Sequence, residues 1–331
     1  MSSATPDDGA LHDHAKHSIA VGSKSFAAAS KLFDKPTRRG AVMLYAWCRH
    51  CDDVIDGQDH GHDAVVLTQA QALQRLVRLQ EQTRAVYAGQ PLSDPAFAAF
   101  REVVVRHGIP EQDAQAHLAG FAMDVDEHHY QSIDDTLLYC YHVAGVVGLM
   151  MARVMGATAR PTLDRACDLG LAFQLTNIAR DIVEDAGIGR CYLPAQWLAE
   201  LDIPADRVAD PQHRPALAAL AKRLVDLAEP YYASAEAGVA ELPWRSAWAV
   251  ATAAAVYRQI GVKVVAAGPH AWDGRTSTSK SDKLAALIAG LWRATTARFR
   301  RWPARPSALW QRPRCVPAPD EGCAAVRAIG P

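Results

Sequence analysis

The sequence lacks any uninterrupted apolar run of the ~20 residues that a membrane-spanning helix requires. Its longest candidates are interrupted, one by Arg153 and the other by Arg258 and Lys263. The first 17 residues are polar and contain no apolar core, so they are not typical of a secretory signal. We therefore expect a cytoplasmic protein that does not cross a bilayer.

Cysteine usage and charge also exclude several classes of protein. The seven cysteines are an odd number scattered along 331 residues, which is not a disulfide framework and suits a reducing compartment. Cys48 and Cys51 form a CxxC pair, but no second pair of matching spacing follows, so a four-ligand zinc site is not expected. The formal net charge is only -1, with both signs mixed, which gives no reason to expect nucleic acid as a partner. The GxSxG elbow of a serine hydrolase is also missing.

Alanine and leucine are abundant, and they occur in helical spacing. Apolar residues recur in steps of three and four, strand-like alternation is scarce, and the turns marked by glycine and proline are too short to be linkers between domains. We predict a single all-α domain over residues 15–300, between a polar, disordered leader at 1–14 and a basic tail rich in Trp and Pro at 301–331. The clearest predicted helices are 37–56, 68–88, 134–156, 163–186, 213–238 and 244–267.

The first chemical signal is a cluster of acids at the end of the helix predicted over 37–56. Asp52 and Asp56 lie one helical turn apart, with Cβ atoms ~5–6 Å from each other, and Asp53 is three residues from Asp56. Carboxylates this close repel one another and lower helix stability by roughly a few tenths of a kcal/mol per pair. Arg49 is close enough to help, but one arginine cannot neutralise three acids, which favours a further cation at this place.

A second polar stripe lies on the helix predicted over 163–186. Gln174, Asn177, Asp181 and Asp185 follow one another at steps of three, four and four, while the other faces of this helix are apolar. Carboxylate and amide oxygens are hard ligands suited to Mg²⁺, which is usually held by a few carboxylates together with substrate phosphates. Two such stripes predict a cavity between helices in which magnesium ions bridge a diphosphate. The alternative is a pair of solvated acidic helix faces, which a single DDxxD motif would usually be.

The residues around both stripes resemble the squalene and phytoene synthase family, and its bacterial phytoene synthases most closely. The matching segments are 22–26, 45–56, 139–148 and 174–185, and the likeness covers roughly residues 15–310. The resemblance implies an isoprenoid synthase fold, in which helices surround a central apolar cavity. It also implies a head-to-head condensation of two geranylgeranyl diphosphates, through a cyclopropylcarbinyl (prephytoene) diphosphate, to phytoene in carotenoid biosynthesis.

The same resemblance assigns roles to individual residues. Those implied to bind Mg²⁺ or Mn²⁺, and through the metal the diphosphate, are Asp52, Asp56, Asn177, Asp181 and Asp185. The four acids among them would be catalytic, and the residues implied to line the reaction centre are Tyr139 and Gln174. The residues implied to contact the substrate are Lys24, Ser25, Phe26, Arg49, Arg180, Tyr257 and Arg275.

Two further segments allow more than one interpretation. Val143, Ala144 and Gly148 would leave room for a long prenyl chain if their helix forms a wall of the cavity, but the same residues would also allow two helices to pack closely. Asp124 and His128 have metal-ligand spacing, yet no third ligand accompanies them, so we expect an exposed helix end there, with an Asp124 that faces the cavity as the alternative.

Two other functions fit the same pattern. A squalene or dehydrosqualene synthase would act on farnesyl diphosphate. Squalene formation needs NADPH, for which the sequence has no glycine-rich fingerprint, so no NADPH is expected. A non-catalytic helical scaffold of the same fold would be expected to lose the acids of both motifs, and they are intact.

The C-terminal segment from Trp292 to Arg314 is rich in arginine and tryptophan and contains no acid. Such a composition can bind anionic lipid headgroups. We expect the tail to make peripheral contact with the inner face of the membrane, and a solvated tail is the alternative.

Overall fold

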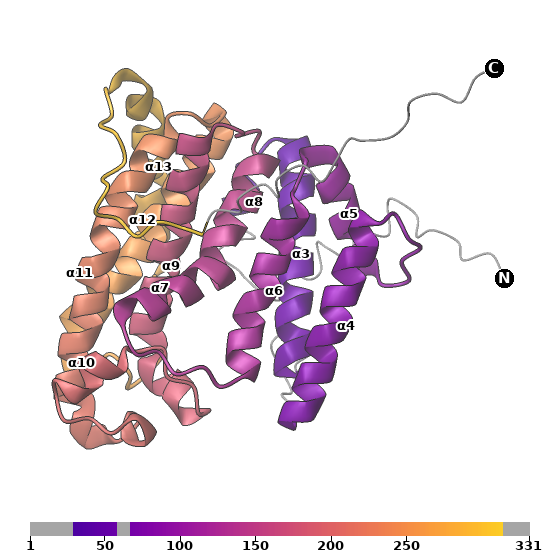
Figure 1. Cartoon of the computed structure of the whole chain (residues 1–331). Coiled ribbons are helices and arrows are strands. Elements are labelled where there is room, and N and C mark those ends of the chain that lie inside the picture. The colour runs from indigo at the N-terminus through magenta and orange to yellow at the C-terminus, as the bar shows by residue number, and fades with distance from the viewer. Residues whose placement is uncertain (1–28, 58–66, 314–331) are drawn as a thin grey trace, which may run out of the picture.

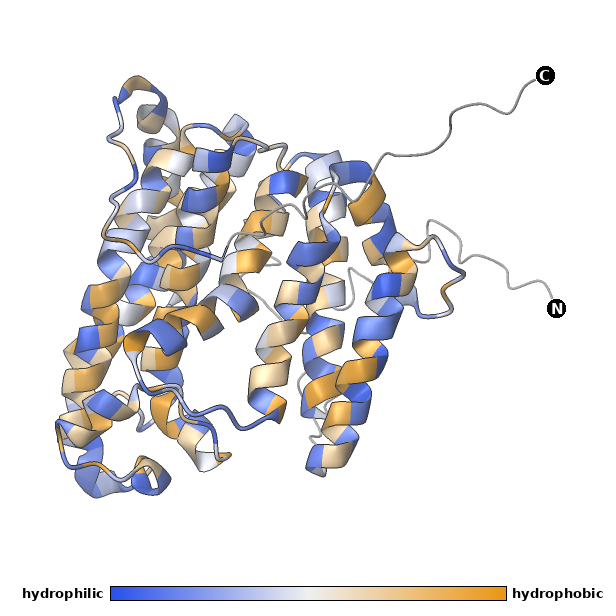
Figure 2. Cartoon of the chain, viewed as in Figure 1, coloured by the Kyte–Doolittle hydropathy of each residue, from blue (hydrophilic) through white to orange (hydrophobic). Residues whose placement is uncertain are grey.

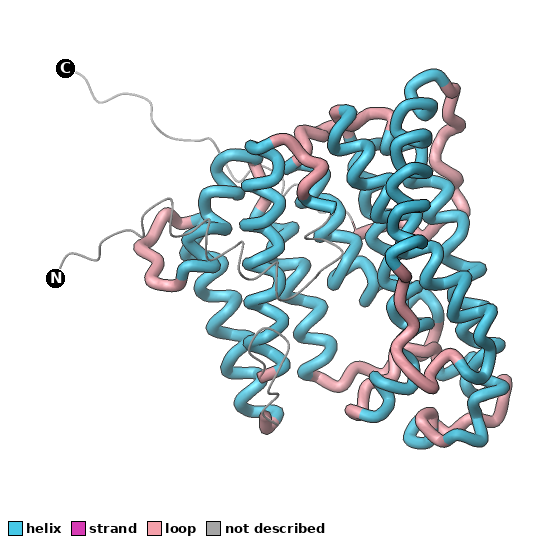
Figure 3. Tube along the Cα trace, turned by 180° about the vertical axis from the view of Figure 1, so that it is seen from behind, coloured by secondary structure: helices cyan, strands magenta, loops and turns pink. Residues whose placement is uncertain are grey.

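The computed structural model describes residues 29–57 and 67–313, and every regular element in these two ranges is helical (Figure 1, Figure 3). The all-α prediction is therefore confirmed. The longer helices are α3 (Lys35–Asp56), α4 (Gln69–Tyr87), α5 (Pro95–His107), α6 (Glu111–Val125), α7 (Ile133–Cys140), α8 (Val146–Val154), α9 (Arg160–Gly187), α11 (Arg214–Val239), α12 (Trp244–Ala267) and α13 (Lys280–Thr296), with a short α10 (Ala195–Ala199). A π-helical turn, η1 (Tyr141–Gly145), joins α7 to α8.

Local sequence sets where these helices begin and end. The Asp34 carboxylate accepts a backbone amide of the first turn of α3 at 2.9 Å. Thr68 and Ser279 form capping boxes at the starts of α4 and α13. Gly57 ends α3 in the left-handed conformation, with φ at 65°. The first acidic motif therefore occupies the last turn of its helix.

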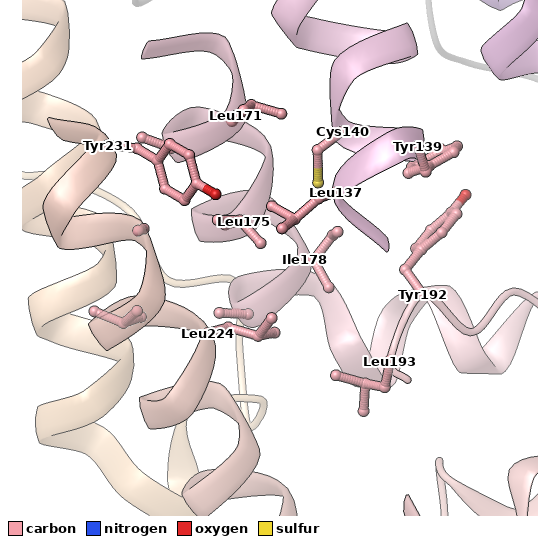
Figure 4. Close-up of a cluster of buried hydrophobic side chains, with 14 of the residues drawn as sticks. Leu137, Tyr139, Cys140, Leu171, Leu175, Ile178, Tyr192, Leu193, Leu224 and Tyr231 are labelled. Carbon is pink, nitrogen blue, oxygen red and sulfur yellow. The ribbon is translucent and has the colours of Figure 1, made fainter. Parts of the chain in front are cut away.

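The helices bury their apolar faces in two clusters, and Figure 2 shows how hydrophobic and hydrophilic residues alternate around each helix. One cluster centres on α9, where Leu175 lies among side chains that include Leu137 of α7 and Leu224 of α11 (Figure 4). The other joins α3 to α5 and α6, and in it Trp47 stacks on Phe100 with ring centroids 3.9 Å apart. The long helix α9, which carries the second polar stripe, packs against α8, α11, α12 and η1.

Glycines allow α9 to approach η1 and α8 very closely. A Cβ added at Gly170 would lie 2.3 Å from the carbonyl oxygen of Ala144, and a Cβ added at Gly148 would lie 2.4 Å from that of Ala166. Neither position has room for a side chain. Close helix packing therefore accounts for Gly148, although Val143, Ala144 and Gly148 also line the central cavity.

Two helical stretches, Ile133–Val154 and Trp244–His270, are long and apolar enough to cross a membrane by length and composition alone. Their length and hydropathy qualify them in spite of Arg153, Arg258 and Lys263, which the sequence analysis took as interruptions. In the structure, 56% of the most apolar part of the first stretch and 39% of that of the second are buried inside the protein, and both stretches pack against α9. Core helices of folded proteins can have the same length and apolar composition, so packing accounts for the apolar composition of both.

The described part of the predicted tail, residues 301–313, lies against α9. Arg305 donates two hydrogen bonds to Asp168, at 2.8 and 2.7 Å, and the Asp168 side chain is completely buried. Arg312 pairs with Asp164 of the same helix at 2.7 Å. These two arginines therefore stabilise the packing of the chain on α9 and are not available to a partner molecule.

Candidate active site

A large apolar cavity runs through the centre of the helical bundle. Its volume is about 690 Å³, and it is lined mainly by hydrophobic residues of α3, α8, α9, α11, α12 and α13. Its lining residues on α9 extend from Thr162 to Asn177. At 1.5 Å per residue the cavity follows this helix for about 22 Å. The cavity is long and apolar enough to suit an extended hydrocarbon chain.

The first acidic motif lies at one end of this cavity, held by arginines. Arg49 contacts Asp52 at 2.9 Å and Asp53 at 2.7 Å. Asp56 pairs with Arg190 at 2.6 Å, and Arg190 comes from the loop that follows α9. Burial, followed by the neighbouring Asp56 charge, raises the pKa of Asp52 to about 7. The Asp52 side chain nevertheless keeps 39% of its surface accessible.

The second motif lies on the last turns of α9. Arg180 donates to the adjacent Asp181 at 2.7 and 2.5 Å, and Arg275 approaches the same carboxylate at 3.7 Å. Burial, followed by the Asp181 charge, raises the pKa of Asp185 to about 7. Asn177 donates to Gln174 at 3.3 Å. Both of these amide side chains line the cavity.

Arg190 connects the two motifs electrostatically. It is bonded to Asp56 of the first motif, and its charge lowers the pKa of Asp185 in the second and of Asp124 on α6 against the effect of burial. Burial lowers the pKa of Arg190 itself, but the hydrogen bond to Asp56 and the nearby charges outweigh burial, so this pKa lies above its usual range. The acids of both motifs therefore face one shared region around Arg190.

The donor set of this region fits a divalent cation that arrives with an anionic ligand. Among the described residues, no three His, Cys, Asp or Glu side chains form a group that could hold a metal ion by themselves. The Oδ1 atom of Asn177 is buried and has no hydrogen-bond partner, although it lies on the predicted metal-binding face. An unpartnered hard oxygen one helical turn from the Asp181 carboxylate suits a metal whose remaining ligands are substrate oxygens and water.

An aromatic cluster beside the two motifs contains Tyr139, which the resemblance placed at the reaction centre. The ring of Tyr139 stacks on that of Tyr192 with centroids 4.4 Å apart, and Figure 4 shows both side chains at the edge of the buried cluster. Both hydroxyl groups donate to the Asp124 carboxylate, at 3.2 Å from Tyr139 and 3.0 Å from Tyr192. Burial raises the pKa of Asp124 to about 6.

Arg190 and Tyr192 are site residues that the sequence reasoning missed. For Asp124 the favoured expectation of an exposed helix end is wrong and the inward-facing alternative fits better, because its carboxylate accepts from two phenols, although His128 is exposed as expected. The available signal was weak: an arginine and a tyrosine occur in the Gly- and Pro-bounded loop directly after the second motif.

Most of the other predicted substrate contacts also lie near this region. Tyr257 of α12 lines the cavity and stacks on Phe173 of α9, with ring centroids 4.2 Å apart. Arg275, in the loop before α13, pairs with Glu184 at 3.2 Å. Three further predicted contacts lie outside the described residues: Lys24, Ser25 and Phe26.

Comparison with known proteins agrees with this geometry. The family model for squalene/phytoene synthase matches residues 19–282. The 15-cis-phytoene synthase of Pantoea ananas is 60% identical over 92% of this chain and 98% of its own length. The 15-cis-phytoene synthase of Enterobacter agglomerans is 61% identical over 88% of this chain and 99% of its own. A crystal structure of a dehydrosqualene synthase in complex with ligand is similar in fold, with a TM-score of 0.76 and 27% identity over 87% of this chain and 98% of that one.

Proposed function

The chain belongs to the squalene/phytoene synthase family, and we propose that it is a 15-cis-phytoene synthase that condenses two geranylgeranyl diphosphates head to head. This would make it a prenyltransferase of carotenoid biosynthesis. One observation supports the proposal most strongly: an apolar cavity about 22 Å long ends in a polar region that contains acids and arginines from both motifs. The relatives at 60% and 61% identity that are named 15-cis-phytoene synthase support the choice of substrate and product.

We propose Mg²⁺ as the cofactor, with Mn²⁺ as a possible substitute, held by Asp52, Asp56, Asn177, Asp181 and Asp185. Bound magnesium neutralises the negative charge that develops on a departing pyrophosphate. The protein's own arginines supply more positive charge at the same end. Arg49, Arg180 and Arg190 each hold a carboxylate, so carboxylates and arginines can exchange partners when diphosphate binds and no charge is left unpaired.

The apolar walls and the aromatic cluster protect and stabilise the cationic part of the reaction. Ionisation of an allylic diphosphate leaves a carbocation that water would quench, and the cavity lining excludes water from it. The stacked rings of Tyr139 and Tyr192 are not part of the cavity lining, and we propose that they stabilise positive charge at the polar end through the π faces that they do not stack on each other. Asp124 fixes both rings through their hydroxyl groups, so they do not need to reorganise during the reaction.

The proposal is tested by incubating the purified protein with geranylgeranyl diphosphate and Mg²⁺ and analysing the hydrocarbon products. We expect phytoene, and we expect Asp181→Asn to abolish its formation. Asp226→Asn is the matched control, because Asp226 lies on the exposed face of α11 and pairs only with Lys222. Phytoene formation that is equal in both variants would contradict the assigned site.

The same assay with farnesyl diphosphate, with and without NADPH, tests the alternative activity of a squalene or dehydrosqualene synthase. The likeness to a dehydrosqualene synthase structure at 27% identity makes this the relevant competitor. We expect the C20 substrate to be used in preference when both are supplied together. Preferential formation of a C30 product would overturn the assignment of substrate.

We also propose that the enzyme works in the cytoplasm, at the inner face of the membrane. The cysteines at the described positions are all free, as suits a reducing compartment. Fractionation of cells that express the protein, followed by immunoblotting, tests this location. Recovery in an extracytoplasmic fraction would contradict it.

A further inference from the structure

Helix α13 exposes a continuous row of large apolar side chains. Leu284, Ile288, Leu291 and Trp292 are 59%, 62%, 38% and 71% exposed, and they share one face of the helix because they are spaced by three or four residues. Phe299, in the turn that follows the helix, is 87% exposed. We call these five residues the α13 stripe. Helix α13 packs against α12 at the surface of the bundle (Figure 1).

Exposed basic residues lie at both ends of the α13 stripe, and the acids nearest to it, Asp282 and Glu236, are each paired with a basic side chain. Lys280 and Lys283 at its start and Arg301 at its end are exposed, and within residues 29–57 and 67–313 none of the three forms an ion pair. Asp282, the one acid of α13, is paired with Lys263 of α12. No further Asp or Glu occurs from residue 283 to residue 313. An apolar row with exposed basic residues at both ends is complementary to a surface that is apolar inside and anionic at its border.

The central cavity reaches the surface beside the α13 stripe. Leu284 lines the cavity together with Lys283 and Leu287, and 59% of the Leu284 surface is also accessible from outside. One side chain therefore belongs both to the cavity wall and to the exposed row. A hydrocarbon that leaves the cavity past Leu284 would meet the stripe first.

We propose that the α13 stripe docks on a lipid bilayer that contains anionic phospholipid, and that the cavity opens into the bilayer beside Leu284. Tryptophan and phenylalanine are favoured at the membrane interface, and basic residues near the surface add attraction to anionic headgroups. The proposed exit route rests on the proposed function, because it concerns an apolar product. The docking itself rests only on the exposed side chains. Membrane contact is thereby assigned to α13 and not to the tail, because Arg305 and Arg312 of the tail are paired with α9.

The test is co-sedimentation of the purified protein with phosphatidylcholine vesicles, with and without phosphatidylglycerol. We expect binding to the anionic vesicles, weakened by salt. The double variant Ile288→Glu and Trp292→Glu should bind about 100-fold more weakly, because two interfacial apolar side chains are lost. Val105→Glu is the matched control, since Val105 is 78% exposed on α5 and lies outside the stripe, and it should bind as the original protein does.

Three outcomes would overturn the proposal. These are equal binding to neutral and anionic vesicles, unchanged binding of the double variant, and a dimer of the original protein in solution that the double variant breaks. The last outcome would show that a second copy covers the stripe. Product formation is measured separately in detergent micelles, where the double variant should keep the original rate because neither residue lines the cavity. Absence of phytoene there would count against the proposed function and not against docking.

Discussion

We expect Gly170→Ala to destabilise the protein and to displace a wall of the cavity. A Cβ at this position on α9 would lie 2.3 Å from the carbonyl oxygen of Ala144, 2.6 Å from its carbonyl carbon and 2.7 Å from the Cα of Gly145. All three are backbone atoms, so no side-chain rotation can relieve the overlap. Helix α9 and η1 must therefore separate, and Val143 and Ala144, which line the cavity, move with η1.

The size of the effect follows from two opposing contributions. Overpacking a close contact usually costs about 1–3 kcal/mol, and an overlap between backbones belongs at the upper end. Alanine has the better helix propensity, which offsets about 1 kcal/mol. We expect the free energy of unfolding to fall by about 2 kcal/mol, measured by urea unfolding followed by circular dichroism, and the rate of phytoene formation to fall with it.

Gly187→Ala is the matched control for this experiment. Gly187 is the last residue of the same helix, and a Cβ there would meet nothing within 4 Å. The substitution should leave the free energy of unfolding unchanged or raise it by about a few tenths of a kcal/mol. If both variants unfold at the same urea concentration as the original protein, the close approach of α9 and η1 is wrong.

Three further predictions concern charged groups. Arg305→Met should lower the free energy of unfolding by about 3–5 kcal/mol, because it leaves Asp168 charged and buried without its arginine partner. Urea unfolding measures this loss. Adding Asp168→Leu to the Arg305→Met chain should restore most of the lost stability. Asp124→Asn should lower kcat about tenfold with KM for geranylgeranyl diphosphate unchanged, because two phenols lose a charged acceptor; an unchanged kcat would contradict the positioning role. The pKa values of Asp52 and Asp185 are about 7 in the folded state and 3.8 ordinarily, so the folded state binds more protons between these values, and the stability of the magnesium-free protein should fall as pH rises from about 4 to about 7. Magnesium must displace those protons, so its affinity in a calorimetric titration should weaken about fivefold per group from about pH 7 to about pH 6, and a pH-independent affinity would contradict the raised pKa values.

Sequence alone could predict those parts of the fold and the site in which all the residues concerned lie on one helix. The helix predicted over 244–267 agrees with α12 at both ends, and that over 163–186 lies within α9. Both acidic motifs were recognisable for the same reason, since steps of three and four place Asp52 beside Asp56 and Asp181 beside Asp185 on one helix. That the two helices meet around one cavity was a prediction from the chemistry of the motifs, and the contacts that join them needed the structure.

The remaining site residues could not be predicted because tertiary contacts bring them together. Arg190 pairs with Asp56, which lies 134 residues earlier in the chain. Asp124 receives hydrogen bonds from residues 15 and 68 positions away. Helical periodicity relates residues three or four positions apart, so it cannot indicate contacts between residues so distant in the sequence. The C-terminal arginines illustrate the same limit, because composition indicated lipid contact whereas Arg305 is bound to a buried carboxylate.

The π-helical turn η1 gives the chain between Tyr139 and Gly148 one residue more than a continuous α-helix would need. Hydrogen bonds in a π turn join residues five apart instead of four, so the wide turn takes in one extra residue while the helices on either side keep nearly the same angular relation. Deletion of one residue within Tyr141–Gly145 would therefore allow a continuous α-helix in which Tyr139 still reaches Asp124 and Gly148 still faces α9. A second deletion would have no wide turn to absorb it and would rotate one flank by about 100° relative to the other. This segment should therefore tolerate the loss of one residue far better than the loss of two.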